Sequence, residues 1–136
     1  MIFFYNIIIT AMFNFLTLLS AIIFVIIDFF YLNIIKQYFK NQIEKVQKTP
    51  LKVNILGALL CYIFLIFGLN YFIIQPKRSV SDAFLLGILI YGVYETTSYA
   101  LLSNWSFLTV IMDTLWGGTL FAITTFIINQ IRKITK

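Results

Sequence analysis

Four long apolar segments, separated by short polar ones, dominate the pattern of the chain. Their approximate bounds are 14–35, 53–74, 83–102 and 107–128. Each is close to the roughly 20 residues that a helix needs to cross the hydrocarbon core of a bilayer. Open sheets leave backbone groups unsatisfied in lipid, and these segments lack the alternation of a membrane β-barrel strand. The pattern therefore predicts an all-α, integral membrane four-helix bundle, with one transmembrane domain over residues 1–136.

The polar segments mark the ends of the predicted spans. Residues 36–52 carry five lysines, with apolar residues at rough helical spacing, which predicts a short interfacial helix after the first span. Pro50 is expected in the first turn of the next helix, and residues 1–13 form a hydrophobic extension before the first span. Five Lys and Arg residues fall on each side of the membrane, so the orientation stays open.

Composition agrees with a membrane protein and removes several functional classes. The chain is 61% hydrophobic and 11% charged, whereas a soluble domain carries about 25% charged residues. Its net charge of +5 lies in loops and at the C-terminus, where anionic lipid head groups attract it, so no nucleic-acid partner is expected. The chain has no histidine, which excludes histidine-ligated haem and zinc sites. No cofactor or metal is predicted, although an oxygen-ligated cation remains open.

Three of the five acidic residues lie inside predicted spans, at Asp28, Glu95 and Asp113. Each is seven or eight residues from a span end on the same side of the membrane, which corresponds to a depth of about 10–12 Å. Burying a carboxylate in a membrane costs about 2.5–3.5 kcal/mol, so such residues usually serve function. No Lys or Arg lies within spans two to four. We therefore predict one buried acidic site that is protonated, shares a proton or binds a cation.

Helical spacing places further residues near these acids. The polar residues expected to support the site are Tyr91, Tyr94, Thr97, Ser98, Thr114 and Trp116. The small residues expected to admit a neighbouring helix are Gly57, Gly68, Gly87 and Gly117. Trp105, in the turn between the last two spans, is interpreted as an interfacial belt residue. A purely structural interpretation stays open. In it, the protonated acids only form hydrogen bonds between helices, and Trp116 is a packing residue without a role in the site.

These motifs resemble a predicted four-span membrane-protein family of unknown function, number 2177. The family pattern has an Asp late in span one, a Gly and a Pro around the end of span two, and a Tyr-Asp-x-Thr-Asn motif in span three. A Trp and then Asp-x-x-Trp-Gly follow in span four. The matching positions here are Asp28, Gly68, Pro76, Gly87, Tyr91, Tyr94-Glu95-Thr96-Thr97-Ser98, Trp105 and Asp113-Thr114-Leu115-Trp116-Gly117. Glu95 replaces Asp, Ser98 replaces Asn, and Tyr31 stands where the family tends to Trp. The resemblance implies the fold and the site residues, and it implies no activity.

Three functions remain open from the sequence. The favoured one is proton- or cation-linked transport or conduction by a homo-oligomer, because four short helices enclose only a narrow pathway. The second is an intramembrane lipid- or isoprenoid-modifying enzyme that uses a protonated carboxyl, although no nucleophile or cofactor motif supports it. The third is a non-catalytic membrane subunit. In each case the protein is a multi-pass integral membrane protein surrounded by membrane lipid.

Overall fold

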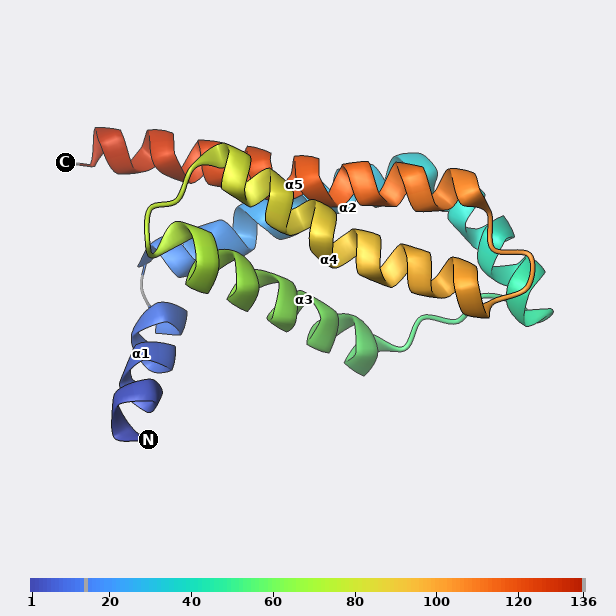
Figure 1. Ribbon diagram of the computed structural model, residues 1–136, viewed down its shortest axis with the longest axis horizontal. Helices are drawn as coiled ribbons and strands as arrows, with labels where there is room; N and C mark the ends of the chain where they lie inside the picture. The colour runs from blue at the N-terminus through green and yellow to red at the C-terminus, as the bar shows by residue number, and fades with distance from the viewer. Residues whose placement is uncertain (14, 136) are drawn as a thin grey trace.

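The computed structural model describes residues 1–13 and 15–135, and the described residues contain helices and no strands. Four helices are long and apolar enough to span a membrane. They are α2 (Phe15–Gln47), α3 (Ile55–Leu69) continued by η1 (Asn70–Ile74), α4 (Val80–Leu101) and α5 (Phe107–Ile134). A shorter helix, α1 (Ile2–Phe13), projects from one end of the bundle (Figure 1). The predicted all-α membrane bundle is confirmed, while Asn14, where the first span was predicted to begin, lies outside the described residues.

Helix α2 is longer than the predicted first span. The interfacial helix predicted for residues 36–52 is instead a continuation of α2, because no Gly or Pro interrupts residues 15–47. Its 33 residues extend about 50 Å at the helical rise, well beyond a hydrocarbon core of about 30 Å. The last turns lie beside the turn between α4 and α5, where Gln42 Nε2 donates to the carbonyl of Asn104 at 2.8 Å.

The connection from α2 to α3 also differs from the prediction. Lys48 adopts a left-handed conformation (φ 60°) directly after α2, and residues 50–54 lie outside any helix. Helix α3 begins only at Ile55, where the side chain of Asn54 accepts a hydrogen bond from the backbone N–H of Gly57 at 3.1 Å. Pro50 is therefore part of the loop and not of the first helical turn.

Helices α4 and α5 form the most closely packed pair of the bundle and run side by side along their length (Figure 1). A capping box starts α4, in which the backbone N–H of Asp82 donates to Ser79 Oγ at 3.0 Å. Where the helices cross, a Cβ added to Gly87 would overlap the carbonyl of Gly117. Only glycine allows backbones to approach so closely, so both glycines lie where close packing was predicted.

Helix α3 packs differently, and the two glycines predicted to bring it close to a neighbour do not do so. Gly57 is exposed, and an added Cβ would meet only Asn54, at 3.8 Å. Gly68 is buried, but an added Cβ would find no atom within 4 Å. The reason is that α3 is anchored by its C-terminal end, where Leu69 and Ile74 are buried, while Leu56 is 67% exposed near its start.

One face of α2 carries the core of the bundle from end to end. Its buried residues are Thr17, Ser20, Phe24, Asp28 and Gln42. The first four are three or four residues apart, and Gln42 follows Asp28 by about four helical turns, so all five lie on one helix face. At Phe24 the core is apolar, since this ring meets that of Phe121 edge to face at 5.4 Å and both are fully buried. The aromatic pair thus separates a polar cluster around Ser20 from a second one around Asp28.

Candidate functional site

The three predicted acids come from three different helices and are all withdrawn from the surface. Asp28 lies on α2, Glu95 on α4 and Asp113 on α5. Their exposed fractions are 6%, 0% and 8%. Their placement on one side of the Phe24–Phe121 pair follows from the α4–α5 turn, which sets Glu95 near the end of one helix opposite Asp113 near the start of the next.

The buried carboxyl groups of Glu95 and Asp113 lie close together as a pair. The indole Nε1 of Trp105 donates to Glu95 Oε2 at 2.9 Å. The second oxygen of Glu95, Oε1, is buried and receives no hydrogen bond from an N–H or hydroxyl group in the described part of the chain. Two ionised carboxylates carry no donor between them, so a proton held by the pair is what can satisfy this oxygen. On the far side, the hydroxyl of Tyr31 donates to Asp113 Oδ1 at 2.8 Å.

Asp28 is held separately from the pair. The hydroxyl of Tyr62 donates to its Oδ2 at 2.5 Å, and the indole of Trp116 donates to its Oδ1 at 2.8 Å. The Trp116 ring in turn stacks on Tyr31, with ring centroids 4.1 Å apart and an interplanar angle of 8°. The stacked rings therefore connect Asp28 to the donor of Asp113. Trp116 does more than pack, since its N–H holds a carboxylate.

The three acids are thus arranged as a carboxyl pair and a third carboxylate with its own two donors. Within residues 1–13 and 15–135, no three His, Cys, Asp or Glu side chains gather in a way that could hold a metal ion. What the arrangement can do is bind and release a proton at the pair, with the hydroxyl of Tyr31 and the indole of Trp105 fixed on either side.

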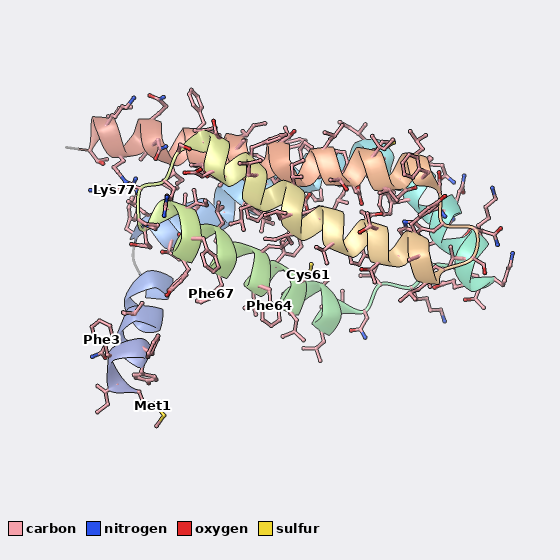
Figure 2. All side chains as sticks on the ribbon, in the orientation of Figure 1. Met1, Phe3, Cys61, Phe64, Phe67 and Lys77 are labelled. Carbon is pink, nitrogen blue, oxygen red and sulfur yellow. The ribbon has the colours of Figure 1, made fainter. Side chains whose placement is uncertain are left out.

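A cleft of about 410 Å³ opens beside Asp113, between α3, α4 and α5. Its lining residues are Cys61, Phe64, Leu65, Ile90, Tyr91, Tyr94 and Asp113. The sulfur of Cys61 lies on the side of α3 that faces α4 (Figure 2). Apart from the carboxyl of Asp113, its walls are apolar or aromatic.

The predicted supporting residues take up different positions. Tyr91 and Tyr94 line the cleft, and the ring of Tyr91 lies directly over Gly117, where a Cβ would overlap it. Ser98 is hydrogen-bonded to Tyr94, at the rim of the cleft. Thr114 has a buried hydroxyl without a partner among the described residues.

Thr97 is not brought to the carboxyls and is exposed on the outer face of α4. The prediction for Thr97 fails for a geometric reason. Two residues along a helix correspond to a rotation of about 200°, so Thr97 points away from Glu95.

Sequence reasoning missed three of the four donors that hold the carboxyl groups. Trp105 is not an interfacial belt residue, since it is 6% exposed and its indole faces Glu95. Tyr31 and Tyr62 also donate to acids. The signal that points to Tyr31 is its position one helical turn after Asp28, on the same buried face of α2. For Trp105 and Tyr62 the partners are ten and 34 residues away along the chain, and their pairing depends on tertiary structure.

Comparisons with known proteins agree with this architecture. Neither curated proteins nor solved structures give a significant match to the chain. A family model described as "Predicted membrane protein (DUF2177)" matches residues 3–128. The matched region contains α2, α3, η1 and α4 complete, almost all of α1, and α5 up to its last turns, and with them all three buried acids. The chain is therefore a multi-pass integral membrane protein that belongs to the DUF2177 family of predicted membrane proteins.

Proposed function

We propose that this membrane protein carries out proton-linked transport, with the Glu95–Asp113 pair as the proton-binding site. The proposal rests on the buried Oε1 of Glu95, which receives no hydrogen bond from an N–H or hydroxyl group in the described part of the chain, and on the buried carboxyl of Asp113 beside that of Glu95. Such an oxygen is costly to bury unless a proton is present. A site whose hydrogen bonding depends on one proton is suited to taking up and releasing that proton.

The polar groups on the buried face of α2 supply a route to the pair from one membrane surface. Beyond Tyr31, towards the α4–α5 turn, the hydroxyl of Tyr38 lies 2.9 Å from that of Thr109, which also donates to Gln42 Oε1 at 3.3 Å. A hydroxyl group can pass a proton along a hydrogen-bonded chain, because its oxygen both donates and accepts.

On the opposite side the route is closed by the fully buried rings of Phe24 and Phe121. Past these rings, the hydroxyl of Ser20 and the amide of Asn70 hydrogen-bond to each other, with Asn70 Nδ2 donating to Ser20 Oγ at 2.9 Å. A transporter needs such an asymmetric barrier, because a site open to both surfaces at once would only leak. The aromatic pair is the part that has to move if the site is to reach the second surface.

Proton uptake into liposomes tests this function. The purified protein is reconstituted with a pH-sensitive dye inside the vesicles, and a potassium diffusion potential drives protons inward. We expect uptake with the unchanged protein and none above protein-free vesicles with Glu95→Gln. The matched control is Glu44→Gln, which makes the same chemical change at the membrane surface. The backbone N–H of Leu51 donates a hydrogen bond to Glu44, and the side-chain oxygen of Gln can still accept it.

Two results would argue against the proposal. Uptake that is equal in the Glu95→Gln and Glu44→Gln proteins would assign the carboxyl pair a structural role. Loss of uptake in both would show that the assay reports damage to the fold and not the chemistry of the pair. Elution of each variant as the same species in size-exclusion chromatography establishes that folded protein is being compared.

A further inference from the structure

We propose that the cleft beside Asp113 binds a cationic amphiphile, with an amine or quaternary ammonium head at the carboxyl and an apolar body along α3. As a substrate class for proton-linked transport, this inference rests on the function proposed above. Its structural basis is separate, since it concerns the lining of the cleft and not the proton of the pair.

The volume and lining of the cleft match a small amphiphile. Its volume of about 410 Å³ lies within the usual range of about 300–1,000 Å³ for small-molecule sites. Such sites are mostly apolar and carry a few polar groups that fix the orientation of the ligand. Here Leu65 and Ile90 supply apolar wall, and Asp113 is the sole ionisable acid in the lining.

The charge of the lining selects the head group. No Lys or Arg is among the described residues that line the cleft, so nothing there would pair with an anionic head. Two tyrosine rings, those of Tyr91 and Tyr94, flank the same space. Aromatic faces attract ammonium groups, because the face of the ring is its negative side. A carboxyl with two aromatic neighbours therefore favours a cation over a neutral or anionic head.

Binding of such a cation would compete with the proton of the carboxyl pair. An ammonium group beside Asp113 stabilises the ionised carboxylate, and the proton between Asp113 and Glu95 is then free to leave. Exchange of one positive charge for another at the same carboxyl is what couples an organic cation to a proton. No covalent bond forms or breaks in this step.

The entry side of the cleft explains why the ligand should be an amphiphile. Two of the lining residues, Phe64 and Tyr94, are 72% and 59% exposed. In a membrane these side chains face hydrocarbon, so a ligand reaches the cleft sideways from the lipid. A molecule that partitions into the bilayer and keeps its charged head near one surface would enter at the depth of Asp113.

The single cysteine of the chain makes this proposal testable in the otherwise native protein. Cys61 lines the cleft, so an occupant should shield it from a membrane-permeant maleimide. The probes are octyltrimethylammonium, octyl sulfate and octanol, which share one tail and differ in head charge, added to protein in lipid nanodiscs. At ten times the half-saturating concentration of octyltrimethylammonium, labelling should slow about tenfold, because only the empty fraction reacts. The other two probes should leave the labelling rate unchanged.

Single substitutions test whether the protection of Cys61 depends on the carboxyl group of Asp113. Asp113→Asn should abolish protection, whereas Asp82→Asn, the same change in the capping box at the membrane surface, should retain it. Ile90→Trp narrows the cleft without touching the acids and should also remove protection, which keeps the test valid if Asp113→Asn does not fold. Cys61→Ser should give no labelling at all.

The outcomes separate this inference from the proposed function. Equal protection by all three probes, or unchanged protection in Asp113→Asn, would overturn the cationic ligand. Proton uptake with no protection of Cys61 would overturn only the ligand class. Protection by the ammonium probe without proton uptake would uphold the ligand site and remove transport.

Discussion

Two glycines of neighbouring helices show how differently the two halves of this bundle are built. On α4, Gly87 meets the backbone of α5 so closely that a methyl group would overlap the carbonyl of Gly117. On α3, Gly68 is buried, yet a methyl group there would touch nothing within 4 Å. The backbones of α4 and α5 are therefore in direct contact, whereas α3 is held by side chains, through Tyr62 at its middle and the buried residues near its C-terminal end.

This difference assigns separate tasks to the two regions. The carboxyl pair spans α4 and α5, where the close crossing fixes the positions of Glu95 and Asp113. The cleft lies between this rigid pair and α3, whose start is free of close contact. A movement of α3 can change access to Asp113 without disturbing the pair. A site built on rigid helices keeps its geometry, and the movements that open or close access to it occur in less tightly packed elements.

Gly87→Ala should have the largest effect on stability. The added methyl group would meet backbone atoms of Gly117 and Gly118, which cannot rotate away as a side chain can. Overpacking of this kind costs about 3 kcal/mol, and the forced separation should also part Glu95 from Asp113 and abolish proton uptake. Reversible unfolding in mixed detergent micelles measures the change in free energy of unfolding.

The matched control is Gly68→Ala on α3. Since an added methyl group finds free space there, the higher helix propensity of alanine should leave stability unchanged or raise it by up to about 1 kcal/mol. Similar losses of stability in both variants would show that α3 is packed as tightly as α4, and the contrast between the two regions would disappear.

Trp105→Phe should have the next largest effect, because it removes the N–H that holds Glu95 Oε2. Both oxygens of a fully buried carboxyl would then lack an N–H or hydroxyl donor, at a cost of about 2 kcal/mol. Tyr71→Phe serves as the comparison on the α3 side, since Tyr71 is 39% exposed and Phe retains its stacking on Phe67. Thermal unfolding of the detergent-solubilised variants measures both. Equal melting temperatures would mean that the indole does not support the pair.

The bundle itself could be predicted from the sequence because lipid imposes simple rules. An apolar segment of about 20 residues must be helical, and an acid seven or eight residues from its end must lie at a defined depth. Depth alone was enough to place Glu95 opposite Asp113. Depth does not give the angle around the helix, so it could not show that Asp28, predicted as the third member of the buried acidic site, takes its hydrogen bonds from Tyr62 and Trp116.

The predictions were wrong where the local sequence is compatible with two structures and only tertiary contacts decide between them. Trp105 has the position of an interfacial residue, and only the fold shows that the turn directs its indole to Glu95. The lysines after Lys36 suggest a helix on the membrane surface, yet the same residues continue α2 because the α4–α5 turn provides partners for Tyr38 and Gln42. Gly68 has the signature of a packing glycine, but a glycine packs closely only where another backbone is present.

The smallest predicted effect concerns the attachment of α3 to α2. Asn70 is 2% exposed and donates from Nδ2 to Ser20 Oγ at 2.9 Å. Asn70→Leu removes this bond, although Ser20 Oγ still donates to the carbonyl of Thr17 at 2.8 Å. Hydrogen bonds between membrane helices contribute about 0.6 kcal/mol on average and up to about 1.7. We therefore expect a loss of about 1 kcal/mol, together with faster maleimide labelling of Cys61, because a more loosely held α3 opens the cleft. The double variant Ser20→Ala, Asn70→Leu should be as stable as Asn70→Leu, because the bond between the two side chains is already absent in the single variant. Labelling that stays slow in the single variant would show that the end of α3 does not control access to Asp113.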